Sequence, residues 1–153
     1  MIIQVKKVSR RGSHYVGTEP PEVMGLERDR FVRAAGELRY SLFAVVVSGR
    51  LLVSGTLQVR IRAQCSRCAE YFSLVVREPA FLRAYPVSAS TEEVDVTPDL
   101  REALVLRIPI YPLCREDCRG LCPYCGANLN REECTCSPQA MESRWDVLDK
   151  LRL

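Results

Sequence analysis

The chain has 153 residues, of which 47% are hydrophobic and 27% are charged, a composition typical of one globular domain with or without a small appendage. This balance excludes global disorder, and no apolar run approaches the roughly 18 residues of a membrane-spanning helix, so we expect no membrane partner. The net charge of +3 permits contact with nucleic acid without requiring it. Apolar residues precede Lys6 and Lys7, the reverse of the order in a secretory signal, and we therefore expect a cytoplasmic protein.

The first 37 residues are weakly patterned, with one strand expected near residues 2–8, and the following stretch, residues 38–84, predicts an antiparallel meander. Gly55 suggests a bulge in its second strand. From Thr56 to Gln64 the side chains alternate strictly between apolar and polar, which places one set against a core and the other in solvent. The set expected in solvent is Gln58, Arg60, Arg62 and Gln64.

A polar, acidic stretch follows the meander, and residues 86–97 predict a loop. Thr97 as the cap and Pro98 in the first turn then predict the start of a short helix. A second short helix is expected from Ser143 to Leu151, close to the end of the chain.

Six cysteines stand within residues 114–136, a segment too small to fold on apolar burial alone. The sequence therefore predicts an α+β fold, mainly an antiparallel β-sheet meander with two short helices and a C-terminal cysteine-rich zinc module. We expect a β-rich domain with one helix over residues 1–113 and the zinc-binding segment with the last helix over residues 114–153.

The eight cysteines form four close pairs, and thiolates in such pairs are typical zinc ligands in a reducing compartment. Four pairs suffice for two zinc ions with four thiolates each, and the pairs can be combined in three ways. The favoured combination joins Cys65, Cys68, Cys114 and Cys118 in one site and Cys122, Cys125, Cys134 and Cys136 in the other. Only one residue separates Cys134 from Cys136, so one of these two could stand outside the site.

Three other uses of the cysteines stay open: disulfides, a redox Cys-x-x-Cys pair and an iron–sulfur cluster. Enzymatic activity is not expected, because the sequence has no carboxylate pair with motif spacing, no Ser/His/Asp set and no phosphate-binding loop.

The cysteine motifs also resemble those of a known family. Cys65-Ser66-Arg67-Cys68 is similar to the Cys-x-Arg-Cys signature of the YceD family, and residues 112–130 and 144–148 resemble its C-terminal signatures. The resemblance covers residues 38–151 and implies support of large-subunit (23S) ribosomal RNA accumulation, with no established enzymatic activity. Some relatives carry histidines at the positions of Cys114 and Cys118 while they keep Cys-x-Arg-Cys, which implies that these four positions form one site.

Residues 50 to 83 include six arginines but only two acidic residues. Two of the arginines, Arg60 and Arg62, lie on the same face of a strand. Because guanidinium groups match phosphate oxygens, Arg60, Arg62 and the neighbouring Arg67 are candidate RNA-binding residues, with Tyr71 as a stacking platform. The face could equally be a solvated one, and Arg67 could instead donate hydrogen bonds across the cysteine turn.

Two functions follow from these residues. In the first, the protein is a ribosome-biogenesis factor that binds large-subunit rRNA or a pre-ribosomal particle. In the second, it is a zinc-stapled adaptor that recruits a ribosomal protein or a processing enzyme without touching RNA. The acidic residues Glu92, Glu93 and Asp95 would suit a basic protein partner.

Overall fold

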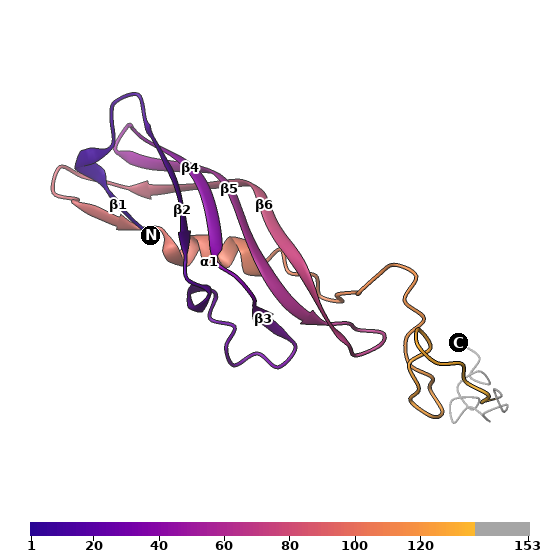
Figure 1. The fold of residues 1–153 in the computed structure, drawn as a ribbon. Coiled ribbons are helices and arrows are strands. Elements are labelled where there is room, and N and C mark those ends of the chain that lie inside the picture. Colours follow the sequence, from indigo (N-terminus) through magenta and orange to yellow (C-terminus); the bar gives the residue numbers. More distant parts are fainter. Residues whose placement is uncertain (137–153) are drawn as a thin grey trace, which may run out of the picture.

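The computed structural model describes residues 1–136, which form an elongated antiparallel sheet with one helix across it and a cysteine-rich segment beyond one end (Figure 1). In chain order the elements are β1 (Ile2–Gln4), the 3₁₀ turn η1 (Val5–Lys7), β2 (Ser13–Glu19), the 3₁₀ turn η2 (Pro21–Met24), β3 (Val32–Ala34), β4 (Leu38–Val47), β5 (Arg50–Gln64), β6 (Tyr71–Pro86), β7 (Glu93–Asp95) and α1 (Thr97–Val105).

The expected meander is confirmed, and its centre is the 15-residue strand β5. One side of β5 pairs first with β4 and, nearer its end, with the short strand β3, whereas β6 lies along the other side. The bulge expected at Gly55 is also present, as a shift of register between Gly55 and Leu57 against β6. A Cβ atom at Gly55 would lie 2.1 Å from the carbonyl oxygen of Ser41, so only glycine allows β4 to approach so closely.

The core lies between the inner face of the sheet and helix α1. Leu57, Val59 and Ile61 of β5 are buried there, as the alternation predicted, and α1 contributes Leu100 and Leu104. Burying a large apolar side chain stabilises a fold by about 1.5–3 kcal/mol, so this contact is the main source of stability for the sheet. The opposite face of β5 consequently lies in solvent.

Two local predictions are wrong. The stretch 86–97 is not only a loop, because Glu93–Asp95 forms strand β7 and pairs with β1 in a separate two-stranded sheet. Thr97 is the first residue of α1 and not its cap; Val96 takes the capping position without a side-chain bond. The Thr97 hydroxyl instead donates to Asp95 Oδ1 at 2.5 Å, which ties the helix start to β7.

α1 is the only α-helix within residues 1–136, and the second expected helix, Ser143–Leu151, lies outside the described residues. In the described part of the chain, no helix is long and apolar enough to cross a membrane. After α1 the chain runs in an irregular conformation to the far end of the β5–β6 hairpin, where the cysteines gather (Figure 1).

Candidate metal centres

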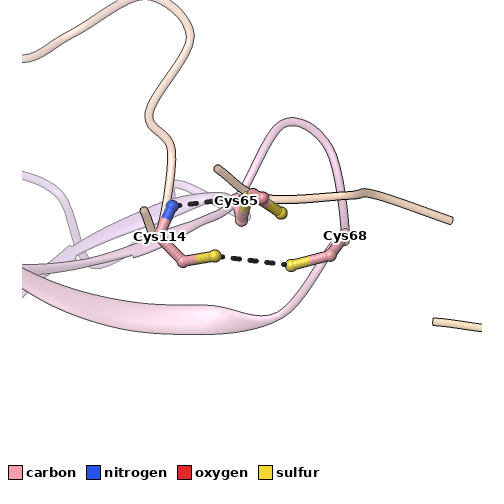
Figure 2. A group of neighbouring side chains, drawn as sticks. Cys65, Cys68 and Cys114 are labelled. Carbon is pink, nitrogen blue, oxygen red and sulfur yellow. Dashed lines mark hydrogen bonds between the residues drawn. The ribbon is translucent and has the colours of Figure 1, made fainter. Parts of the chain in front are cut away.

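The first cysteine cluster forms where the β5–β6 turn meets the segment that follows α1 (Figure 2). Cys65 and Cys68 lie in the turn, which the Cys65 N–H closes by donating to the carbonyl of Glu70 at 2.8 Å. The N–H of Ser66 donates to the carbonyl of Pro112, also at 2.8 Å, and this bond brings the later segment alongside.

Cys114 and Cys118 complete this cluster. The Sγ atoms of Cys65 and Cys118 are 3.8 Å apart, as are those of Cys68 and Cys114. All four Sγ atoms lie within 4.8 Å of one another, so one tetrahedral ion can contact all of them. Cys65, Cys68 and Cys118 are at most 3% exposed, and the cluster is therefore closed to solvent on most sides.

The thiols of this cluster differ in how readily they ionise. Burial by itself disfavours the Cys65 thiolate, but backbone N–H groups, first that of Cys114, stabilise it and lower its pKa to about 6. Burial and the neighbouring thiols act together on Cys114 and raise its pKa to about 12. Four thiolates this close repel one another, so a cation at their centre is what allows all four to ionise together.

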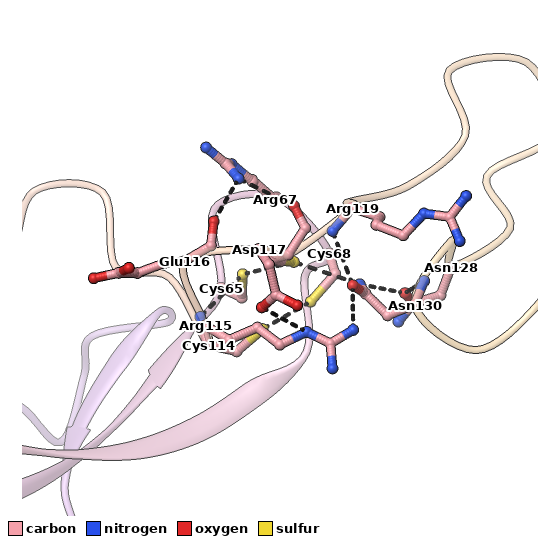
Figure 3. A network of polar contacts seen from close by, with 11 residues as sticks. Cys65, Arg67, Cys68, Cys114, Arg115, Glu116, Asp117, Arg119, Asn128 and Asn130 are labelled. Atoms are coloured by element: carbon pink, nitrogen blue, oxygen red, sulfur yellow. Dashed lines mark hydrogen bonds and ion pairs between the residues drawn. The ribbon is translucent and has the colours of Figure 1, made fainter.

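Arg67 lies in the Cys65–Cys68 turn, and its side chain links the two segments of the cluster (Figure 3). Its Nη1 donates to the backbone carbonyls of Glu116 and Cys118, both at 3.1 Å. The carbonyl of Arg67 accepts the N–H of Leu121 at 3.1 Å. Arg67 thus makes the hydrogen bonds across the turn that were one of its two expected roles.

The second cluster is built entirely within residues 122–136. Its four Sγ atoms also lie within 4.8 Å of one another, with the Cys134 Sγ 3.3 Å from that of Cys122 and 3.5 Å from that of Cys125. Cys136 takes part despite its tight spacing from Cys134, and neither stands outside. Cys125 and Cys136 are exposed, so solvent reaches this cluster.

A tight turn positions the first two thiols of the second cluster. The N–H of Gly126 donates to the carbonyl of Cys122 at 2.9 Å, with Gly126 at φ 74°, a conformation that favours glycine. The backbone N–H groups of Cys125 and Tyr124 lower the pKa of Cys122 to about 6. The same grouping of four and four that the spacing favoured is therefore the one that the fold assembles.

Asn130 lies between Cys125 and Cys134 in the chain, and its side chain contacts the first cluster, a role that the sequence did not suggest (Figure 3). Its Nδ2 donates to Cys118 Sγ at 3.4 Å, and its Oδ1 accepts the N–H of Arg119 at 2.8 Å. Nearby, Asn128 donates to Glu70 Oε1 at 3.0 Å, which anchors the second cluster on the β5–β6 turn. These contacts could not be predicted from the sequence, because a side-chain hydrogen bond to a distant residue leaves no motif.

All eight cysteines are free thiols. The closest Sγ pairs, at 3.3–3.8 Å, lie well beyond the S–S bond of about 2.05 Å. Both clusters could thus hold a metal ion as they stand.

The arginine face is the third feature that the sequence singled out. Arg60 and Arg62 are exposed on the outer face of β5, and the Arg62 guanidinium lies 5.1 Å above the ring centre of Tyr71. Among residues 1–136, neither arginine forms an ion pair. Arg83, by contrast, is paired with Asp99 at 3.4 Å and does not belong to this free group.

The sheet adds arginines that sequence reasoning missed. Arg33 of β3 lies directly opposite Arg62, and Arg39 of β4 and Arg77 of β6 both lie opposite Gln58. All three are exposed. Only the strand register reveals this grouping, since 44 positions separate Arg33 from Arg77 in the sequence.

Taken together, the fold and the clusters define a small β-rich protein whose sheet ends in two four-cysteine sites able to bind metal. Residues 53–152 match the model of the family described as Large ribosomal RNA subunit accumulation protein YceD, and the chain belongs to this family. The match extends over more than half of the chain and includes all eight cysteines.

Several curated proteins are similar to this chain. An uncharacterized protein from Mycobacterium tuberculosis is 39% identical over 100 residues, which cover 56% of this chain and 48% of the relative. Two chloroplastic proteins named Large ribosomal RNA subunit accumulation protein YCED homolog 1 are also similar. The one from Arabidopsis thaliana is 34% identical over 61 residues, which cover 40% of this chain and 19% of the relative. The one from Zea mays is 38% identical over 55 residues, which cover 35% of this chain and 19% of the relative. The chain thus spans about half or less of the length of these relatives. No solved structure matches it.

Proposed function

We propose that the protein is a cytoplasmic ribosome-biogenesis factor that supports the synthesis, processing or stability of large-subunit 23S rRNA by binding the rRNA or a pre-ribosomal particle. The observation that carries this proposal is the exposed arginine face around Arg60 and Arg62, which has no acidic partners within residues 1–136. Arginine forks bind phosphate oxygens in pairs, and RNA supplies such oxygens in a regular row. The names of the chloroplastic relatives support the same role.

We further propose that each cysteine cluster holds one zinc ion with a structural and not a catalytic role. A tetrahedral site with Zn–S bonds of about 2.3 Å places its sulfurs roughly 3.8 Å apart, and two Sγ pairs of the first cluster have this spacing. A site with four thiolates leaves no position for a water or substrate, which fits a protein without enzymatic activity. Elemental analysis should find close to two zinc ions per chain, whereas iron would support the cluster alternative.

Crosslinking in cells tests the RNA contact. Arg60→Glu combined with Arg62→Glu should abolish most of the rRNA that crosslinks to the unaltered chain, because charge reversal repels the phosphates. Arg10→Glu combined with Arg11→Glu is the matched control, since it changes the net charge equally at exposed residues that lie in the turn before β2. RNA recovery that is undiminished in the first variant contradicts a binding site on this face.

The same experiment addresses the adaptor function. A protein that copurifies with both variants while RNA is absent would favour an adaptor over an RNA-binding factor. The acidic stretch offered for a basic partner is partly neutralised within the chain: Glu92 pairs with Lys6 at 2.8 Å, and Glu93 accepts a bond from Gln4. The structure thus leaves fewer free acidic groups for such a partner than the sequence suggested.

A further inference from the structure

Two exposed aromatic side chains lie next to the arginines at the end of the sheet that carries the cysteines. The N–H of Gln64 donates to the carbonyl of Phe31 at 2.8 Å, which places Phe31 opposite Gln64, and Tyr71 pairs with Gln64 from the other side. Two residues along the strands, on the same face, Arg33 lies opposite Arg62. We name Phe31, Arg33, Arg62 and Tyr71 the aromatic–arginine patch.

The backbone of Phe31 and the ring of Tyr71 are held in place although both residues are exposed. Asp29 Oδ1 accepts the N–H groups of Phe31 at 2.7 Å and of Val32 at 2.9 Å, so the backbone of Phe31 is fixed on both sides while its side chain stays 58% exposed. The Tyr71 hydroxyl donates to the carbonyl of Arg30 at 2.9 Å, and its side chain is 45% exposed. A ring fixed before binding costs little entropy when a ligand stacks on it.

The positive charge of the patch favours the binding of an anion. Like charges directly opposite each other on neighbouring strands destabilise a sheet, and no carboxylate in the described part of the chain forms an ion pair with Arg33 or Arg62. Arg33, Arg62 and Tyr71 line a hollow of about 280 Å³. This volume is at or below the lower end for pockets that enclose a small molecule, and it suits one group of a longer ligand.

We infer that the aromatic–arginine patch binds a single-stranded segment of RNA, with a phosphate between Arg33 and Arg62 and bases stacked on Phe31 and Tyr71. Arg60 lies two residues from Arg62 on the same face, about 6.6 Å along β5, and takes a neighbouring phosphate. This inference rests on the RNA-binding function proposed above and specifies the form of the RNA.

A duplex does not fit this patch. The bases of an A-form helix stack on one another, so their faces cannot reach protein rings, and its deep major groove admits no side chains. Unpaired bases stack readily on exposed aromatic rings without strong sequence preference. Exposed rings beside guanidinium groups that have no carboxylate partner in residues 1–136 therefore suit an unpaired strand.

Fluorescence anisotropy with the full, metal-loaded chain tests the inference. The probe is a labelled RNA of about 12 nucleotides without self-complementarity, used alone and annealed to its complement at one salt concentration. The single strand should bind at least tenfold more tightly than the duplex. Phe31→Ala and Tyr71→Ala should each weaken single-strand binding by about tenfold, in the range for loss of one stacked base, and leave duplex binding unchanged.

Controls separate this inference from the proposed function. Leu82→Ala, at a residue 61% exposed on the same strand as Tyr71, should not change binding, and circular dichroism checks that each variant is folded. Equal binding of both probes, or unchanged binding by folded Phe31→Ala and Tyr71→Ala variants, overturns the single-strand inference and leaves RNA binding intact. Failure of the unaltered chain to bind either probe overturns both.

Discussion

The two cysteine clusters each offer four thiol ligands but join very different parts of the chain. In the first cluster Cys65 and Cys118 meet across 53 sequence positions and are buried, whereas the second closes within residues 122–136 and exposes Cys125 and Cys136. An ion in the first cluster thus fixes the end of the β-sheet to the segment after α1. An ion in the second cluster fixes only its own short segment.

The difference shows that ligand identity does not determine what a metal site does for a fold. Closing a long loop restricts the unfolded chain more than closing a short one, and a buried site also excludes the water that would compete for the ion. We therefore expect the first cluster to govern global stability and the second to govern local order.

The largest expected effect is that of removing one thiol from the first cluster. Cys118→Ala should lower the free energy of unfolding by several kcal/mol, because structural metal sites contribute directly to folding. The matched variant Cys136→Ala should change the stability of the sheet by less than about 1 kcal/mol, since its cluster closes locally. Thermal unfolding followed by circular dichroism measures both, and equal losses would remove the distinction between the clusters.

Metal removal should release the two ions one after the other. A chelator reaches the exposed thiols of Cys125 and Cys136 before the buried ones, so one ion should leave while the sheet is still folded. Native mass spectrometry should detect a species with one ion at intermediate chelator concentrations. Loss of both ions in a single step, together with unfolding, would mean that the clusters act as one unit.

Arg67 should matter to the first cluster more than its exposure suggests. Arg67→Lys keeps the charge but loses the guanidinium Nη1 that donates to the carbonyls of Glu116 and Cys118. We expect a loss of about 1–2 kcal/mol in stability and earlier release of the ion from the first cluster. Unchanged chelator resistance in this variant would show that the turn holds its shape without the guanidinium.

The smallest effect concerns the loss of stability in acid and comes from one buried carboxyl. The Arg107 guanidinium and the N–H of Ala80 hold the pKa of the buried Glu78 below its ordinary value. Such a carboxyl stabilises the fold above its ordinary pKa, and this contribution disappears as the pH falls through the lowered value. Glu78→Gln should cost about 1 kcal/mol at neutral pH and flatten the loss of stability in acid.

The acid dependence that remains in Glu78→Gln comes from the cysteine clusters, whose metal leaves as its ligands take up protons, and from other carboxyls whose pKa is lowered, such as Asp95 with its hydrogen bonds from Thr97. Glu102→Gln is the control, since Glu102 is exposed and lies 3.9 Å from Arg83. Identical acid profiles for Glu78→Gln and the unaltered chain would show that Glu78 contributes nothing measurable.

Features that repeat or are closely spaced along the chain could be predicted from the sequence. The strict alternation from Thr56 to Gln64 identified the buried face of β5, and the close cysteine pairs identified both clusters as sets of four. These features are local, so they are visible without knowledge of which distant segments meet.

Features that depend on distant pairing could not be predicted in the same way. β7 has only three residues, two of them acidic, and forms because β1 lies beside it. The opposition of Arg33 and Arg62 depends on strand register, and the contrast in burial between the clusters depends on where the sheet ends. The helix expected over residues 143–151 and the division of the chain at residue 113 stay predictions.

Gln64 contacts both the cysteine turn and the aromatic–arginine patch. Its side-chain Nε2 donates to the carbonyl of Ala69 inside the cysteine turn at 2.7 Å, while its backbone holds Phe31. We expect a change in the turn on ion loss to reach Phe31, whose backbone lies directly opposite Gln64. The proposed ion and the proposed RNA strand would then be thermodynamically linked, with each raising the affinity of the chain for the other by the same factor.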